Sequence, residues 1–557
     1  MDLEPSEERV GVDSRYSWRY PLPPSTDGRR GERLREVRSV WYLGLPLTSA
    51  HRGSHSGGGA LIAGGGDQTR YENEGTVYPH ASLVEMITYH HHCFPDVEWR
   101  YLDVSHLGWA EIRDLIHRDP PDVAAFSVYS ATAVWALIIA AEIKRVKSAA
   151  IVVFGNDHAG IMYREVLTDA YGGKVVDFVS TGNNGPFTMM GLLYALRGSL
   201  ELREVPSLAY RNGNSVHNQP ASTYPLTLRR LPDYRLIKAE LEQWYDPAFE
   251  VWYAQHYELK RMITLPIDGG CHWGSRPSRR CKHCSIQGLT PKVSDVQSTV
   301  AALEVTVGDL NSNVYAAGDS TLGMSRNQWS GQIHFLDDLA EACEASSILR
   351  GKRFMLAYGL VQEFLQSAEL CKGFVRTWNV GLEAFDPKLL KQDSKGINKG
   401  PDRVYEALEL ARALDYKLYI SGILGLQGTT IGKLRSEVDQ WLALAAEYQD
   451  NITTVSVAAP AVIPGSRMYW ESYTGSTELR RQHREILPVR HLSQRYVETN
   501  SDVAFADVER AIQDVAQGIM SLDAGRGKLK VGGYMLGGND EEETRELRLL
   551  DEVFKRS

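Results

Sequence analysis

The sequence predicts an α/β protein with an N-terminal doubly wound, Rossmann-like domain, a partial (β/α)6 barrel and a mostly helical C-terminal region. Two observations predict this fold. Strand-like apolar runs alternate with helical segments from Arg38 onward, and a second alternating series starts at Met262, just before three clustered cysteines. With 557 residues, the chain has the length of about three domains.

The N-terminal domain is expected over residues 37–205, after a loosely ordered arm at 1–36 that is rich in Pro, Arg, Glu and Ser. Its strands are predicted at 39–45, 98–104, 123–128, 150–154 and 175–180. Helical segments between these strands predict a parallel sheet that is covered on both faces. Residues 206–261, which contain several Pro and Tyr, are interpreted as a linker.

One uncharged stretch, residues 123–141, approaches the length of a membrane span. Pro120 and Pro121 precede it, polar residues interrupt it near Ser130, and a charged segment follows it. This pattern predicts a buried strand followed by a packed helix, so we expect no membrane span.

The barrel is expected over residues 262–470, and residues 471–557 are expected to form the helical C-terminal region. Barrel strands are predicted near 262–268, 312–318, 353–359, 377–384, 417–423 and 453–459. Ligands of parallel barrels bind at the carboxyl ends of the strands, and the cysteine loop follows the first strand at that end. The loop is therefore the first candidate site.

Half of the six cysteines lie in this loop, as Cys271, Cys281 and Cys284. Three thiolates can hold three irons of a 4Fe-4S cluster or three corners of a zinc site, and His283 beside the last cysteine also suits zinc. The residues alone leave both possibilities open. Six cysteines are too few for a disulfide framework in a chain this long, which favours a cytoplasmic setting.

The remaining cysteines and a histidine run have simpler interpretations. Cys343 and Cys371 fall in or beside helical stretches and are expected to be buried thiols. The run from His90 to Cys93 is expected to be a helix end, because consecutive side chains diverge and cannot easily chelate one ion.

The composition excludes some classes of partner. The formal net charge is -9, so no broad basic field is available for nucleic acid or for an anionic membrane. The first residues show no signal-peptide pattern. A small-molecule or peptide substrate is favoured.

Several sequence motifs, taken together and in their order along the chain, resemble those of a known protein family. They are residues 122–130, 151–160 and 176–185 in the first domain, and 317–321, 380–385, 395–399, 420–428 and 464–466 in the barrel. Together with the cysteine loop, this series resembles the cobalamin-dependent radical S-adenosylmethionine (radical SAM) enzymes over about residues 38 to 470. Most members separate their first two cysteines by three residues, whereas nine separate Cys271 from Cys281 here.

The resemblance implies a cobalamin-binding first domain, a radical SAM barrel and three cofactors: a 4Fe-4S cluster, cobalamin and S-adenosyl-L-methionine (SAM). The implied cluster ligands are Cys271, Cys281 and Cys284. The implied SAM-binding residues are His283, Gly318, Asp319, Glu383, Gly422 and Gly425. The implied cobalamin-binding residues are Arg70, Ser127, Tyr129, Ser130, Gly155, Asp157, His158 and Gly182. His158 could ligate cobalt, although cobalamin without a protein ligand is the favoured expectation.

The implied function is a C-methyltransferase of natural-product biosynthesis. It would transfer a methyl group from SAM via methylcobalamin to a carbon of a small-molecule or peptide-derived substrate, and an aromatic amino acid such as tryptophan also fits. The alternative is a cobalamin-dependent radical rearrangement or cyclisation without methyl transfer. A non-catalytic cobalamin sensor with a zinc site is a third hypothesis. An external electron donor and a monomeric state are expected.

Overall fold

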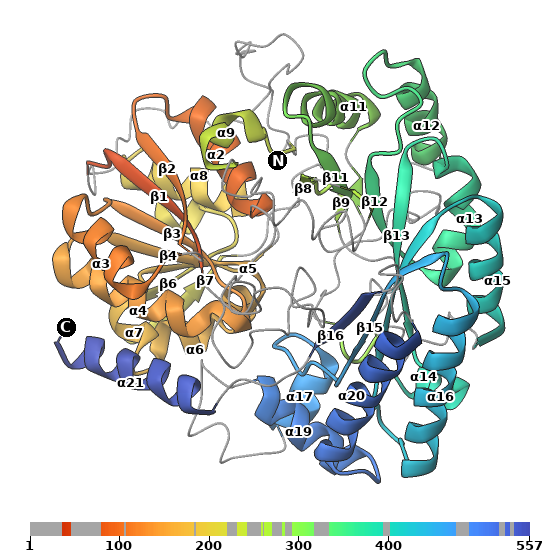
Figure 1. Cartoon of the computed structure of the whole chain (residues 1–557). Helices are drawn as coiled ribbons and strands as arrows, with labels where there is room; N and C mark the ends of the chain where they lie inside the picture. The colour runs from red at the N-terminus through yellow and green to blue at the C-terminus, as the bar shows by residue number, and fades with distance from the viewer. Residues whose placement is uncertain are drawn as a thin grey trace.

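The computed structural model (Figure 1) shows two seven-stranded, mainly parallel sheets side by side, each covered by helices. It describes residues 36–45, 80–104, 107–182, 185–219, 231–241, 258–259, 261–269, 281–284, 292–293, 295–316, 334–393, 401–474, 489–522, 530–534 and 540–556. Among these residues, no helix has both the length and the apolarity that a membrane crossing requires.

The first sheet has the strand order β2-β1-β3-β4-β5-β6-β7. Its strands are β1 (Ser39–Gly44), β2 (Glu98–Asp103), β3 (Val123–Ser127), β4 (Ile151–Gly155), β5 (Phe178–Ser180), β6 (Leu208–Asn212) and β7 (Ser215–Asn218). The first five are parallel and match the five predicted strands, so the expected doubly wound fold is confirmed. The antiparallel hairpin β6–β7 was not predicted, and it extends this sheet from within the residues interpreted as a linker.

Helices cover both faces of this sheet. They are α2 (Ala81–Cys93), α3 (Trp109–Arg118), α4 (Ala133–Val146), α5 (Asn156–Ile161), α6 (Tyr163–Thr168), α7 (Gly172–Val175) and α8 (Gly185–Leu196), with short 3-10 turns η2 (Ser130–Thr132) and η3 (Leu202–Glu204). Strand β1 shows the two-faced packing. Val40 and Tyr42 join the core under α2 and α8, whereas Trp41 and Leu43 join the core under α3 and α4. The uncharged stretch forms β3 and α4, as predicted.

The run from His90 to Cys93 forms the last turn of α2. His90 is fully buried, and its Nδ1 lies 2.8 Å from the hydroxyl of Tyr42. Burial lowers the pKa of His90 from 6.5 to about 4. The imidazole is therefore neutral in the folded chain at pH 7, in agreement with a core histidine rather than a metal site.

Acid should destabilise the first domain through this residue. The unfolded histidine binds a proton near pH 6.5 and the folded one only near pH 4, so this stability is complete above pH 6.5 and is lost as the pH falls. A shift of this size corresponds to about 3 kcal/mol in total. Thermal midpoints measured from pH 7 to pH 4.5 should fall less steeply in His90→Gln than in the wild type. Equal slopes would contradict the prediction, and His91→Gln, at an exposed position of the same turn, is the control.

The second sheet has the order β16-β15-β14-β13-β12-β11-β8, and every neighbouring pair is parallel. Its strands are β8 (Met262–Thr264), β11 (Asn313–Ala316), β12 (Met355–Leu360), β13 (Val375–Glu383), β14 (Lys417–Ile423), β15 (Ile452–Ala458) and β16 (Lys530–Tyr534). Six of them match the predicted barrel strands. β16 was not predicted, and it extends the open barrel from within the C-terminal region.

Besides these strands, the elements that follow the first unit in the chain are mainly helical. They are η5 (Tyr234–Ile237), α9 (Lys238–Leu241), α11 (Val296–Glu304) with a π-helical turn η8 (Val305–Asp309), α12 (Phe335–Ala345), α13 (Val361–Cys371), α14 (Pro387–Gln392), α15 (Pro401–Ala413), α16 (Ile431–Glu447), α17 (Arg467–Thr474), α19 (Val489–Asn500), α20 (Phe505–Leu522) and α21 (Asp540–Arg556), besides a small pair β9 (Asp268–Gly269) and β10 (Lys292–Val293). Cys343 and Cys371 are buried in α12 and α13, as predicted.

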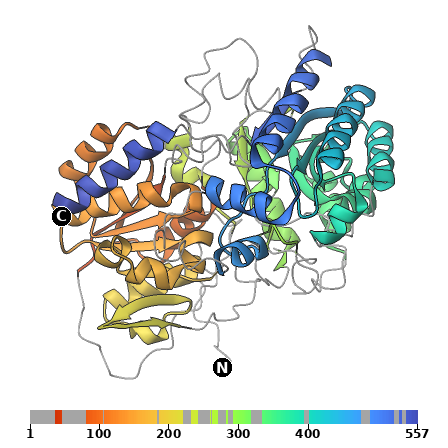
Figure 2. The same ribbon diagram turned by 90° about the horizontal axis from the view of Figure 1, so that it is seen from below.

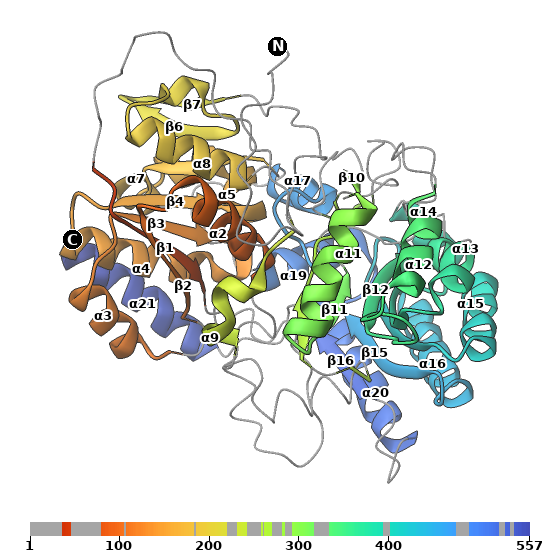
Figure 3. The ribbon, with the colours of Figure 1, turned by 90° about the horizontal axis from the view of Figure 1, so that it is seen from above.

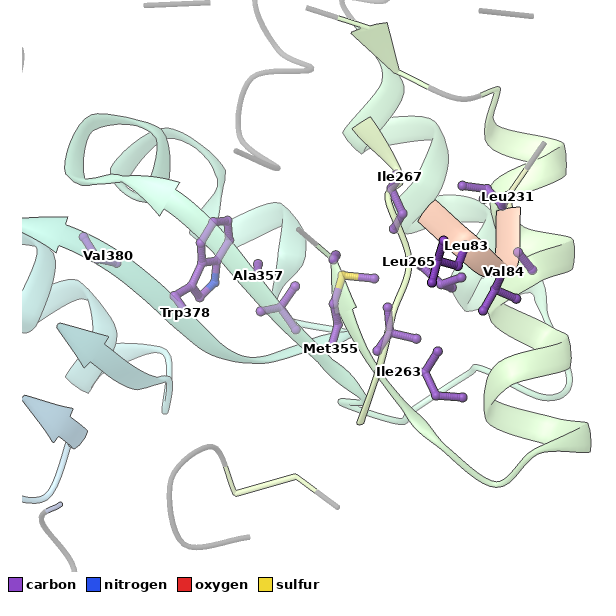
Figure 4. Close-up of a cluster of buried hydrophobic side chains, with 14 of the residues drawn as sticks. Leu83, Val84, Leu231, Ile263, Leu265, Ile267, Met355, Ala357, Trp378 and Val380 are labelled. Atoms are coloured by element: carbon purple, nitrogen blue, oxygen red, sulfur yellow. The ribbon is translucent and has the colours of Figure 1, made fainter. Parts of the chain in front are cut away.

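The hydrophobic core runs from one sheet unit into the other. Leu83 and Val84 of α2 belong to the same buried cluster as Ile263, Leu265 and Ile267 at the first barrel strand (Figure 4). The two units are therefore packed against each other through apolar side chains. This packing fixes the orientation of the strand ends of one sheet relative to those of the other.

The C-terminal helix adds a second connection. After β16 joins the barrel, α21 lies along α4 of the first unit (Figures 2 and 3). Phe554 is buried there, Trp135 donates its indole N–H to Glu546 at 3.1 Å, and Tyr171 donates its hydroxyl to Asp551 at 2.6 Å. The helix α21 thus connects the two units, and we call it the C-terminal strap.

Removing the Phe554 ring should loosen this strap. Phe554→Ala deletes a buried aromatic ring, which costs about 3 kcal/mol in a packed core. Hydrogen exchange in α21 and in the facing part of α4 should accelerate, while the central strands β13 and β14 stay protected. Lys555→Ala, at an exposed position of the same helix, should leave exchange unchanged. Unchanged protection of α21 in Phe554→Ala would contradict the role of the strap.

Candidate functional site

The first group of candidate residues lies at the carboxyl ends of β3 and β4. Asn156, which follows β4, donates from its side-chain amide to the hydroxyl of Ser127 at 2.9 Å. Ser130 Oγ and His158 Nδ1 lie 3.0 Å apart. These two contacts join the loops that follow neighbouring strands, so Ser127, Ser130 and His158 lie in one cluster.

Asn156 is a residue that sequence reasoning missed. It is a non-glycine residue with a positive φ of 74°, directly after Gly155. Such backbone conformations cost free energy and concentrate at functional sites. The helix α5 begins at this residue, and its Gly160 approaches β5 so closely that a Cβ there would lie 3.1 Å from the Ser180 carbonyl oxygen.

A second cluster occupies the ends of β1 and β2 and was also missed. The imidazole of His80 stacks on Tyr129 with 6.3 Å between ring centroids. A Cβ on Gly44 would lie 2.8 Å from the His80 ring and 2.9 Å from the Asp103 carboxylate, so only glycine fits. Burial lowers the pKa of His80, while Asp103 opposes that shift. The helices change sides between β1 and β3, and ligands of open α/β sheets bind at this switch point.

Of the other residues expected to bind cobalamin, the structure describes three and leaves two wholly or partly undescribed. Tyr129, Gly155 and Gly182 lie at this same carboxyl edge, after β3, at the end of β4 and after β5. Arg70 and the side chain of Asp157 lie outside the described residues.

The second group of candidates lies on the barrel, at the turn from Cys281 to Cys284. The N–H of Lys282 donates to the Asp393 carbonyl at 3.0 Å, and the Lys282 carbonyl accepts from the N–H of Met468 at 2.9 Å. The turn is therefore held between the end of α14 and the start of α17. Cys281 is buried and Cys284 is half-buried, whereas Cys271 lies outside the described residues.

His283 is oriented by a carboxylate. Its Nδ1 lies 2.6 Å from Oδ2 of Asp393, whose side chain is buried. This contact occupies Nδ1, so only Nε2 of His283 could ligate a metal. Asp393 was not identified from the sequence, because it lies 110 residues away.

Glu383 ends β13 with an unusual backbone. Its φ is +70°, and the strand register shifts between Gly381 and Glu383, which is a β-bulge. The next turn is held by Glu437, which accepts from the N–H groups of Phe385 at 2.9 Å and Asp386 at 2.8 Å. Burial raises the pKa of Glu437, and these backbone donors oppose the shift. Glu383 is buried at the carboxyl end of the barrel, where the sequence placed it.

The two glycines after Glu383 have packing reasons for being glycine. A Cβ on Gly422 would lie 2.1 Å from the Trp441 ring, and Gly425 has a φ of +86° with a Cβ position 2.9 Å from Val508. Both contacts are to the surrounding helices. Gly318 and Asp319 lie outside the described residues.

The two groups of candidates are linked through α17. Tyr469 donates its hydroxyl to the sulfur of Met162 at 3.6 Å, and Met162 directly follows α5, the helix that carries His158. The neighbouring Met468 holds the cysteine turn. Because α5 follows the carboxyl end of β4 and α17 follows that of β15, the carboxyl edges of both sheets face each other at this contact.

The described side chains supply part of the ligand set of the implied cluster. Within the part of the chain that the structure describes, no three His, Cys, Asp or Glu side chains are grouped as metal ligands. The N–H of Cys284 donates to the Cys281 carbonyl at 3.4 Å, which folds the two cysteines into one tight turn. Two thiols from one turn at the barrel end fit two of the three ligands of a 4Fe-4S cluster.

Comparisons with known proteins extend this picture. The sequence matches no protein-family model and no curated protein sequence. The structure is similar to the radical SAM methyltransferase TsrM from Kitasatospora setae with cobalamin and a [4Fe-4S] cluster bound, with a TM-score of 0.59, 14% identity and coverage of 94% of this chain and 100% of TsrM. A TsrM structure with tryptophan and the SAM analogue aza-SAM bound gives a TM-score of 0.58 at 14% identity, covering 93% of this chain and 98% of TsrM.

The cobalamin-dependent radical SAM enzyme OxsB, with aqua-cobalamin and SAM bound, gives a TM-score of 0.54 at 16% identity. That match covers 72% of this chain but only 52% of OxsB, so the chain corresponds to about half of the OxsB protein. At these identities the likeness shows the fold. The chain thus has the two-domain fold of cobalamin-dependent radical SAM enzymes, as the sequence predicted.

Proposed function

We propose that this protein is a cobalamin-dependent radical SAM C-methyltransferase. It transfers a methyl group from SAM to a carbon of a small-molecule or peptide-derived substrate in natural-product biosynthesis, and tryptophan is a candidate because a TsrM structure contains it as substrate. The observation that carries the proposal is the contact through α17, which brings the His158 edge of the first sheet to the Cys281–Cys284 turn of the second. The similarity to TsrM over nearly the whole chain supports it.

The described residues have distinct roles in this proposal. Cys281 and Cys284, with Cys271, hold the 4Fe-4S cluster. Asp393 orients His283 beside it, so that the imidazole can pack on the bound SAM. Glu383, Gly422 and Gly425, with Gly318 and Asp319, complete the SAM site. When bound, the cluster would supply electrons and the open iron for SAM, and cobalamin would carry the methyl group.

The carboxyl edge of the first sheet receives the cobalamin. The proposed contacts are Ser127, Tyr129, Ser130, Gly155, His158 and Gly182, with Arg70 and Asp157, and the structure adds His80, Asp103 and Asn156 as candidates. His158 is already oriented by Ser130 through Nδ1, so only its Nε2 could approach cobalt. We propose that the protein supplies no ligand to the cobalt of the bound cobalamin. We also propose that the reaction uses an external electron donor and that the protein is a monomer.

Anaerobic incubation with methyl-labelled SAM tests the function. The purified, reconstituted protein is incubated with cobalamin, a reductant and a panel of amino acids and small peptides that includes tryptophan. A labelled product heavier by one CH2, together with S-adenosylhomocysteine, is expected. A product of unchanged mass would favour the rearrangement or cyclisation instead. Stoichiometric zinc and no iron in the anaerobically purified protein would reject both enzyme functions and favour the sensor.

A further inference from the structure

The centre of β13 carries a carboxamide whose oxygen atom is unpaired among the described residues. The side chain of Asn379 is only 8% exposed, and its Oδ1 is buried with no hydrogen-bond partner among the described residues. The strand is regular here, with Asn379 paired to Tyr358 and Tyr419 on the two neighbouring strands. Buried polar groups are almost always paired, so this exception requires an explanation.

Asn379 faces the interior of the barrel. Its neighbours Trp378 and Val380 belong to the core under the helices (Figure 4). The Trp378 ring meets Phe364 of α13 edge-on with 5.4 Å between centroids. Successive side chains of a strand point to opposite faces. The carboxamide therefore lies on the inner face, away from the helices.

The side chains that flank Asn379 on this face are uncharged. Its row contains Tyr358 of β12, Tyr419 of β14 and Thr454 of β15, and the next row toward the carboxyl end contains Gly381, Ser421 and Ser456. Tyr419 is hydrogen-bonded to Ser456, and burial raises its pKa, so it stays a neutral phenol. A charged group bound against these two rows would find no counter-charge within them, whereas a neutral polar group would not need one.

On this face of β13, no side chain separates Asn379 from the bulge at Glu383. Gly381 is the residue on the same face between Asn379 and the bulge at Glu383, and it has no side chain. A substrate group that enters the barrel past Glu383 would therefore meet the carboxamide without an intervening side chain of β13.

We propose that Asn379 is a specificity residue for the substrate of the reaction proposed above. Its Oδ1 accepts a hydrogen bond from a ring N–H of an uncharged heteroaromatic group, such as an indole, that lies between the phenols of Tyr358 and Tyr419. Flat rings suit a position between two aromatic side chains, and a buried acceptor discriminates strongly against an analogue that lacks the donor. This inference rests on the proposed function and narrows its substrate class.

Binding of three probes to the cobalamin-loaded, cluster-containing protein tests the proposal. L-Tryptophan should bind, 1-methyl-L-tryptophan, which lacks the ring N–H, should bind about tenfold more weakly or worse, and L-glutamate should not bind. In Asn379→Leu, the difference between the two tryptophans should disappear while the affinity for SAM stays unchanged. Ser367→Ala is the matched control, because Ser367 Oγ is also buried and, among the described residues, unpartnered, but lies on the helix α13.

A second measurement separates a substrate role from a structural one. Without ligand, Asn379→Leu should keep or raise the thermal midpoint, because the buried Oδ1 that it removes has no hydrogen-bond partner among the described residues. A fall of the midpoint, weaker SAM binding in this variant, equal binding of the two tryptophans to the wild type, or failure of tryptophan to bind would each overturn the proposal. Methyl transfer to a substrate without a ring N–H would overturn it too, yet would leave the proposed function standing.

Discussion

Replacing Cys281 or Cys284 by serine should abolish iron binding and all measurable methyl transfer. Both thiols come from one turn that is held in place by Asp393 and Met468, so neither loss can be compensated by a shift of the loop. A serine hydroxyl is a far poorer ligand for iron than a thiolate. Iron and sulfide content after anaerobic reconstitution, with the visible absorbance of the cluster, measures the effect independently of activity.

Cys343→Ala provides the matched control for these variants. Cys343 is buried in α12, and burial raises its pKa to about 12, so it stays a protonated thiol that does not bind metal. Iron content should equal that of the wild type. Full iron and sulfide in Cys281→Ser, or loss of iron in Cys343→Ala alone, would contradict the cluster assignment.

The strands of both sheets were predictable because each is a local apolar run between turn residues. The inner polar row at Asn379 is also visible in the sequence of β13, where Thr377, Asn379 and Gly381 alternate with Trp378 and Val380. Both faces of this strand are nearly buried, however, so its apolar content masked the alternation. The sequence pattern therefore predicts the strand, but it does not predict the function of the polar side chains on the inner face.

β16 and the partners of the cysteine turn could not be predicted in the same way. β16 is short and contains Gly532 and Gly533, which weaken any local strand signal, and its conformation depends on pairing with β15. Asp393 and Met468 approach Lys282 from helices more than one hundred residues away. Such contacts depend on how the barrel closes, which periodicity within one segment does not encode.

Gly422→Ala should destabilise the barrel by about 3 kcal/mol, at the upper end of overpacking costs. The new methyl group would lie 2.1 Å from Cζ2 of Trp441, and that ring is fully buried and packed on Phe385 at 5.1 Å between centroids. Neither ring can move away without opening the core. Thermal or urea midpoints of the purified protein measure the loss.

Gly432→Ala is the matched control, since Gly432 lies exposed in the same helix as Trp441 and a Cβ there meets nothing within 4 Å. This variant should gain up to about 1 kcal/mol, because alanine restricts the unfolded chain and favours helix. The double variant Gly422→Ala with Trp441→Phe should recover part of the stability by removing the clashing atoms. If the refolded double variant binds SAM normally, Gly422 is glycine because of Trp441; if SAM binding stays weak, the backbone of Gly422 itself contacts SAM.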